Sequence, residues 1–261
     1  MPLESEMTVV RVAVHKAGQA ILRIAEESYK TARQVDRTVL TTADLESDRI
    51  LKDILLGEFG DYGWLSEETV DDQSRLEADR VWIVDPMDGT REFVMHNPEF
   101  VVSVALVENG YPVLGVIYNP STDDCYEAAT GCGTKLNGHP VFSDHVFEGK
   151  PKVEVSRSDI EKGRFAAFDA LVDLRPCGSI AYKMARLAAG EADATLSVTP
   201  KNEWDIAAGV ILITEADGRV TDLSGKPYLF NQADTLVNGV IAASNQAYDR
   251  ICSIIDNVSV R

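Results

Sequence analysis

The fold of this chain is decided by the stretch Val81-Trp82-Ile83-Val84-Asp85-Pro86-Met87-Asp88-Gly89-Thr90. Its apolar first part, bounded by Pro and Gly, predicts a buried strand that ends in a tight turn. Asp85 and Asp88 leave that strand together, and neighbouring buried carboxylates repel each other unless protons or a cation lie between them. Mg²⁺ is bound by oxygen ligands and usually handles phosphate. The stretch therefore predicts a site for metal-dependent phosphate chemistry.

Two other interpretations fit the same residues. In the haloacid dehalogenase-type phosphatases, the pattern Asp-x-Asp-Gly-Thr carries a nucleophilic aspartate. Here two residues separate the acids, and one of them is Pro86. Alternatively, Asp85 could cap nearby backbone amides while Asp88-Gly89 forms a turn.

Further acidic residues lie before and after this stretch. Glu67-Glu68 follow a short apolar run, and only one of two adjacent side chains in an extended segment can face a given site. Asp44 opens an amphipathic stretch, where it would equally well stabilise a helix N-terminus. Asp205 precedes Ile206-Ala207-Ala208-Gly209-Val210, a small-residue helix start that predicts close packing, and Asp205 could also cap that helix.

The order of these motifs resembles that of the inositol monophosphatase family. The matching residues are Asp44, Glu67-Glu68, Asp85-Pro86-Met87-Asp88-Gly89-Thr90 and Trp204-Asp205, and the resemblance covers nearly the whole chain. Members of that family are lithium-sensitive, Mg²⁺-dependent phosphomonoesterases. The resemblance implies a fold of mixed α+β and α/β character, in which helices and sheets alternate as a sugar-phosphatase-like αβαβα sandwich. It also implies a homodimer.

The resemblance also implies which residues bind metal. Glu67, Asp85 and the Met87 carbonyl match the ligands of a first ion. Asp85, Asp88 and Asp205 match the ligands of a second ion, with Asp85 bridging the two. Glu67 further matches a ligand of a third ion, so two to three Mg²⁺ are expected.

Catalytic and phosphate-binding roles follow in the same way. Asp44 and Thr90 match the pair that orients and deprotonates the attacking water, and Asp205 lies on the substrate side. The backbone amides of Gly89 and Thr90 match the phosphate cradle, a role that a helix N-terminus also favours because its amides are unpaired. No residue suggests a nucleophile, so water is expected to attack phosphorus directly.

The substrate is less well defined by the sequence. Asp88-Gly89-Thr90-Arg91-Glu92-Phe93 and Ser156-Arg157-Ser158 resemble the 3′(2′),5′-bisphosphate nucleotidase branch, although Asp159 stands where that branch commonly has a histidine. Hydrolysis of 3′(2′)-phosphoadenosine 5′-phosphate to AMP and phosphate is therefore expected. An inositol-1-monophosphatase, a promiscuous sugar phosphatase and a binding protein without turnover are the alternatives.

Three cations are candidates for holding such a substrate. Lys183 matches a lysine that the nucleotidase branch uses near its substrate, and a solvated helix lysine is the alternative. Arg157 and Lys201 are further candidates for a second phosphate, and Tyr182 offers an apolar face for adenine.

Composition excludes several other classes of protein. The net charge of −17 over 261 residues disfavours a polymeric nucleic acid as partner. No signal peptide and no membrane-spanning stretch is apparent. The four cysteines lack zinc-like spacing and are expected to be reduced, in a cytoplasmic protein.

Periodicity predicts two halves of one compact unit. Residues 1–145 form an α+β half that carries most metal ligands, and residues 146–261 form an α/β half that carries Asp205 and the substrate-side residues. The expected helices are Val9–Glu27, Leu45–Leu56, Ile160–Leu171, Ser179–Ala189, Trp204–Glu215 and Ala247–Ile255. The expected strands are Trp64–Ser66, Val81–Val84, Val101–Val107, Val113–Tyr118, Lys152–Ser156, Ala194–Val198 and Val240–Ala243.

Overall fold

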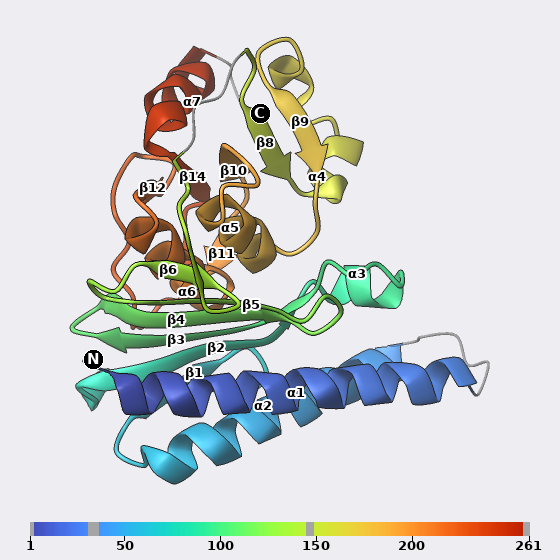
Figure 1. Ribbon diagram of the computed structural model, residues 1–261, viewed down its shortest axis with the longest axis vertical. Coiled ribbons are helices and arrows are strands. Elements are labelled where there is room, and N and C mark those ends of the chain that lie inside the picture. The colour runs from blue at the N-terminus through green and yellow to red at the C-terminus, as the bar shows by residue number, and fades with distance from the viewer. Residues whose placement is uncertain (1–2, 31–36, 145–148, 258–261) are drawn as a thin grey trace.

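The computed structural model describes residues 3–30, 37–144 and 149–257, and its helices and sheets alternate in layers (Figure 1). A helix pair covers one face of a seven-stranded sheet, and a second helix pair separates that sheet from a five-stranded one. A last helix packs on the outer side of the smaller sheet. The layered αβαβα architecture expected from the sequence is confirmed. The boundary expected between residues 145 and 146 lies outside the described residues.

The outer helix pair comprises α1 (Glu4–Lys30) and α2 (Arg37–Glu58), both longer than expected. Their apolar faces include Val10, Val14 and Leu51, which are fully buried against Trp82 and other residues of the large sheet. Burial of such side chains contributes about 1.5–3 kcal/mol each. This contact fixes the angle at which α2 faces the sheet.

The large sheet has the order β1-β2-β3-β4-β5-β6-β7. Its strands are β1 (Gly63–Ser66), β2 (Arg80–Asp88), β3 (Val101–Glu108), β4 (Tyr111–Asn119), β5 (Asp124–Ala129), β6 (Thr134–Leu136) and β7 (His139–Val141). Strand β1 is parallel to β2, and every later neighbour is antiparallel. Asp85 pairs with Ser103 and Asp88 with Val101, with a shift of register between them. Pro86 explains this shift, since it has no amide to donate to the ladder.

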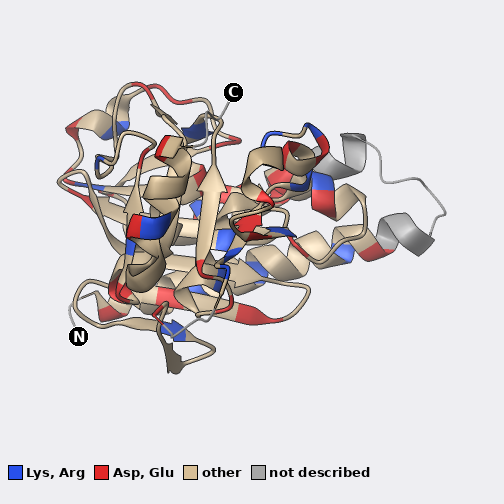
Figure 2. Cartoon of the chain, turned by 90° about the horizontal axis from the view of Figure 1, so that it is seen from above, with Lys and Arg blue, Asp and Glu red and all other residues tan. Residues whose placement is uncertain are grey.

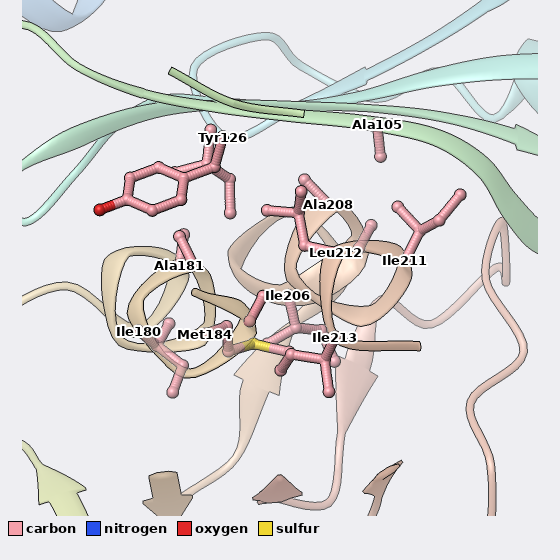
Figure 3. Packing of buried hydrophobic residues seen from close by; sticks show 14 of the residues in the cluster. Ala105, Tyr126, Ile180, Ala181, Met184, Ile206, Ala208, Ile211, Leu212 and Ile213 are labelled. Carbon is pink, nitrogen blue, oxygen red and sulfur yellow. The ribbon is translucent and has the colours of Figure 1, made fainter. Parts of the chain in front are cut away.

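The inner helix pair comprises α5 (Ile180–Ala188) and α6 (Glu203–Glu215), which fill the space beneath the large sheet (Figure 3). The close packing expected of the small residues after Asp205 is confirmed. A Cβ atom added at Gly115 of β4 would lie 2.9 Å from the Ala208 carbonyl oxygen and 2.6 Å from Ile211 Cγ2. Helix α6 therefore lies directly on the strand, and this contact sets the position of Asp205.

The small sheet has the order β12-β14-β10-β8-β9. Its strands are β8 (Lys152–Val155), β9 (Asp173–Pro176), β10 (Ala194–Ser197), β12 (Gly218–Thr221) and β14 (Val240–Ser244), and β11 (Lys201–Asn202) pairs separately with β13 (Leu236–Val237). The outer helix α7 (Asn245–Asn257) packs on this sheet through Tyr248 and Ile251.

The helix expected at Ile160–Leu171 is wrong. The structure has the short helix α4 (Arg157–Glu161) and then a 3₁₀ turn at Ala166–Phe168. Gly163 has φ +70°, a left-handed conformation that commonly ends a helix. Phe165 and Phe168 have helical spacing, but they are buried from this turn.

Charged residues are interspersed over the elements rather than gathered into one basic stretch (Figure 2). None of the described helices combines the length and the apolar character that a membrane span requires. Cys125, Cys132, Cys177 and Cys252 are all free thiols, as expected.

Candidate active site

Asp85 and Asp88 lie at the end of β2 and face different partners. Asp85 is 1% exposed, and its Oδ1 accepts a hydrogen bond of 3.1 Å from the Met87 amide. Asp85 thus caps a backbone amide, as considered from the sequence, and this contact leaves room for a second role of the carboxylate. The Oδ2 atom of Asp88 accepts hydrogen bonds of 2.6 Å from both the Ser179 hydroxyl and the Ala181 amide. Asp88 therefore joins the large sheet to the N-terminus of α5.

Glu67 follows β1 and lies beside Asp85. Its amide donates to the Val84 carbonyl at 3.3 Å, which extends the parallel pairing of β1 with β2 by one residue. Much of the residue is exposed, but its carboxyl group is partly desolvated. That desolvation, with the charges of Asp205, Asp88 and Glu68, raises the pKa of Glu67 to about 7, while a hydrogen bond with Asp85 opposes the rise.

The same cluster raises the pKa of Asp85 well above its ordinary value. Burial is the main cause, followed by the charges of Asp88, Glu67 and Asp205. Carboxylates whose charges repel one another in this way need protons or a cation for neutrality. The structure thus brings together all four of the acidic side chains expected to bind metal.

Asp205 belongs to the first turn of α6. It forms a capping box with Asn202, whose amide donates to Asp205 Oδ2 at 2.8 Å. Burial and then the charge of Asp88 raise the pKa of Asp205 to about 6, while Lys201 opposes the rise. The capping role and the position within the cluster therefore coexist.

Asp44 lies inside α2 rather than at its start, so the helix N-terminal role considered for it is wrong. It is 6% exposed. Burial, followed by the charges of Glu68 and Glu67, raises the pKa of Asp44 to about 8. Asp44 therefore lies near the Glu67 side of the cluster.

Gly89 and Thr90 form the turn from β2 into the short helix α3 (Thr90–Val94). Gly89 has φ +102°, and a Cβ atom there would lie 2.6 Å from the Glu99 carbonyl oxygen. Only glycine fits without strain. The amides of a first helical turn have no partner within the helix, so this turn offers donors to an anion.

The chemistry of the cluster fits a hard divalent cation, because every donor is an oxygen. In the described parts of the chain, however, no three acidic, histidine or cysteine side chains already surround one point as they would a bound ion. One contact is consistent with this, since Asp88 Oδ2 is turned to α5, where it accepts hydrogen bonds from Ser179 and Ala181.

The candidate cations differ in their surroundings. Lys183 is 1% exposed, so the solvated alternative is wrong, and its Nζ lies 3.4 Å from both Ser156 Oγ and the Cys177 carbonyl. Burial lowers the pKa of Lys183, as does the charge of Lys201, while Asp88 raises it. Two lysines thus flank the acidic cluster.

Arg157 is already paired. Its guanidinium forms two hydrogen bonds with the Glu99 carboxylate, one of them 2.8 Å long, and its Nη1 lies 3.6 Å from Glu92. Tyr182 is 7% exposed and its ring packs edge-on against Tyr126, with centroids 6.5 Å apart. Neither side chain is free in the way that contacts with a nucleotide would require.

Sequence reasoning missed the residues that support the acidic cluster. Ser179 and the Ala181 amide hold Asp88 from a segment more than ninety residues away, which no local pattern could reveal. Asp48 and Ser66 hydrogen bond to each other beside Glu67. The spacing of Asp44 and Asp48 was a usable signal, since residues four apart share a helix face.

Comparison with known proteins agrees with this geometry. The chain matches the inositol monophosphatase family over residues 3–259. An inositol-1-monophosphatase of Mesorhizobium japonicum is 34% identical over 220 residues, which cover 78% of this chain and 79% of the relative. The 3′(2′),5′-bisphosphate nucleotidase CysQ of Escherichia coli K12 is 31% identical over 228 residues, which cover 85% of this chain and 92% of the relative.

Solved structures agree as well. The crystal structure of CysQ from Bacteroides thetaiotaomicron, a bacterial member of the same family, matches with a TM-score of 0.82 at 30% identity and covers 92% of this chain and 97% of that one. Together, the layered fold, the acidic cluster and these relatives define the class of protein as a phosphatase. The chain belongs to the inositol monophosphatase family.

Proposed function

We propose that the chain is a Mg²⁺-dependent phosphomonoesterase. The observation that carries this is the cluster of Glu67, Asp85, Asp88 and Asp205, in which burial and the neighbouring acidic charges raise the pKa of Glu67, Asp85 and Asp205. These four carboxylates and the Met87 carbonyl would hold two to three Mg²⁺. When bound, Mg²⁺ supplies positive charge to the phosphate oxygens and acidity to the attacking water.

The residues of the chain then divide the remaining work. The amides of Gly89 and Thr90 bind phosphate oxygens at the start of α3. Asp44 and the Thr90 hydroxyl orient the attacking water, and Asp44 accepts its proton. Because Asp44 is buried beside Glu67 and Glu68, the conversion of this acid to a base depends on the removal of their negative charge.

For the substrate, we propose a 3′(2′),5′-bisphosphorylated nucleotide such as 3′(2′)-phosphoadenosine 5′-phosphate. Support comes from the proximity of Lys183 and Lys201 to each other and to the acidic cluster. The charge of Lys201 lowers the pKa of both Lys183 and Asp205, and the charge of Asp88 raises the pKa of Lys183. A pair of like charges is stabilised by an anion, and a second phosphate supplies one. The CysQ relatives point the same way.

The second candidate is a phosphate of inositol or another sugar. The pairing of Arg157 with Glu99 favours it, since that guanidinium is not available for a second phosphate. The inositol-1-monophosphatase relative has a similar identity. A catalytically silent binding protein is a third possibility, which the complete acidic set disfavours.

The test measures phosphate release from 3′-phosphoadenosine 5′-phosphate, inositol 1-phosphate and fructose 1,6-bisphosphate, with and without Mg²⁺. The nucleotide should have the highest kcat/KM. Lys201→Met should raise KM for the nucleotide about tenfold or more and change inositol 1-phosphate much less, since hydrogen bonds to charged groups contribute about 1.5–3 kcal/mol. Lys226→Met, which removes an exposed lysine, is the matched control. Equal rates on all three substrates would remove the nucleotide preference, and no Mg²⁺-dependent release at all would leave a binding protein.

Inhibition by lithium and assembly as a homodimer are proposed from the family resemblance, and a cytoplasmic location is proposed from the free cysteines. Lithium titration of the phosphate-release rate and the molar mass in solution test the first two.

A further inference from the structure

One face of α2 carries three polar side chains toward the acidic cluster. They are Asp44, Ser47 and Asp48, whose spacing places them together on successive turns of the helix. Ser47 is fully buried and its hydroxyl donates to the Pro86 carbonyl at 2.8 Å. This hydrogen bond ties α2 to the turn between Asp85 and Asp88. The proposed mechanism uses Asp44 and leaves Asp48 without a role.

Asp48 is 7% exposed and both of its carboxylate oxygens accept hydrogen bonds. The Ser66 hydroxyl donates to Oδ1 at 2.5 Å, and the Thr69 hydroxyl donates to Oδ2 at 2.9 Å. Ser66 and Thr69 stand immediately before and after the Glu67-Glu68 pair. Asp48 therefore holds both ends of this turn through hydrogen bonds.

Few other hydrogen bonds from the described residues hold this turn. Strand β1 ends at Ser66, and the amide of Glu67 makes the last backbone hydrogen bond to β2, at 3.3 Å. The Trp64 indole donates to the Thr69 hydroxyl at 3.3 Å, and the Glu68 amide donates to Ser66 Oγ at 3.4 Å, so these two contacts pass through the same hydroxyls.

Glu67 itself borders solvent, into which its side chain could turn if the turn were not held. A mobile ligand must lose its freedom when a cation binds, which weakens affinity. A fixed turn avoids that cost.

We propose that Asp48 is a positioning residue that holds the Glu67–Glu68 turn against the acidic cluster and so raises the affinity for Mg²⁺. This rests on the proposed function, in which Glu67 is a metal ligand. Asp48 itself does not touch metal or substrate. Its two hydrogen bonds restrict where the Glu67 carboxylate can lie before the cation arrives.

The test measures Mg²⁺ binding by calorimetry, without substrate, in Asp48→Asn and Thr69→Val. Loss of an outer residue that orients a ligand typically weakens metal affinity about 10- to 100-fold, and both variants should fall in or near this range. Amide hydrogen exchange over residues 66–70 should become faster in the same variants. With saturating Mg²⁺, kcat should stay within about twofold of wild type, since a positioning residue acts on binding rather than on chemistry.

Asp53→Asn is the matched control. Asp53 lies on the same helix, its side chain is 64% exposed, and it pairs with Arg49 at 2.7 Å. This variant removes the same charge but should leave Mg²⁺ affinity and exchange unchanged. If Asp48→Asn does not fold, Thr69→Val and Ser66→Ala carry the test, because each removes one hydrogen bond to Asp48 together with the longer contact that the same hydroxyl accepts.

The two proposals fail in distinguishable ways. Wild-type protein that binds no Mg²⁺ would overturn the proposed function. Wild-type protein that binds Mg²⁺, together with unchanged affinity in the Asp48 and Thr69 variants, would overturn only the positioning role.

Discussion

Asp205→Asn should make the metal-free protein more stable while it removes activity. In the folded chain, burial and the charge of Asp88 both disfavour the ionised Asp205 carboxylate. Asparagine has nearly the same shape and its side-chain oxygen can still accept the Asn202 amide. It carries no charge, so the repulsion within the cluster decreases. The same substitution removes an expected Mg²⁺ ligand.

The magnitude follows from the pKa of Asp205, which rises from 3.8 to about 6 on folding. At 1.36 kcal/mol for each tenfold change in proton affinity, this corresponds to at most about 3 kcal/mol. Because the folded state binds the proton more tightly, the wild type carries no penalty below pH about 4, an increasing one as the pH rises through 6, and the full one above about 7. The gain in the variant should therefore be near zero at pH 4 and largest at pH 8.

The assay is thermal and urea unfolding in EDTA at pH 4, 6 and 8. For a chain of this length, the expected gain at pH 8 corresponds to about 5–10 °C in Tm. Adding Mg²⁺ should reverse the order, because ligand binding stabilises only the protein that binds it. Asp249→Asn, whose side chain is 86% exposed, is the control and should change Tm little. A variant less stable than wild type in EDTA at pH 8 would refute the electrostatic reasoning.

Three further predictions follow from individual contacts. Asp85→Asn should nearly abolish Mg²⁺-dependent phosphate release without altering the circular dichroism spectrum; retained activity would contradict its assignment as the bridging ligand. Gly115→Ala should cost about 1–3 kcal/mol in urea unfolding, since its Cβ would lie 2.9 Å from the Ala208 carbonyl oxygen, and an unchanged midpoint would show that α6 can shift freely. Ser179→Ala should cost about 1 kcal/mol through loss of the helix cap and should raise the Mg²⁺ concentration for half-maximal rate by releasing Asp88; an unchanged Mg²⁺ dependence would contradict the role of this contact.

The sequence predicted those features that depend on local pattern. The run Val81–Val84 is a buried strand because its side chains are apolar on both faces, and β3 and β4 follow as expected. The Ile160–Leu171 segment misled because Phe165 and Phe168 have helical spacing, although Gly163 in the same segment ends the helix. Apolar spacing alone could not distinguish a helix from a 3₁₀ turn that buries the same rings.

The sequence indicated which acidic residues lie together, but not which residues hold them in place. Asp85 and Asp88 are three residues apart, so their proximity follows from the chain itself. The contacts of Asp88 with Ser179 and of Asp48 with Ser66 depend on how separate elements dock. Arg157 shows the same limit, since its formal charge suggested an anion site and only the structure shows its pairing with Glu99.

The close contact of Gly115 with Ala208 has a consequence beyond packing. It determines the depth at which α6 rests and therefore the height of Asp205 above β2. Any lineage that enlarged either residue would tilt the helix and so move the Asp205 carboxylate. During evolution, substitutions at Gly115 or Ala208 should therefore be accompanied by changes in which cation the protein prefers.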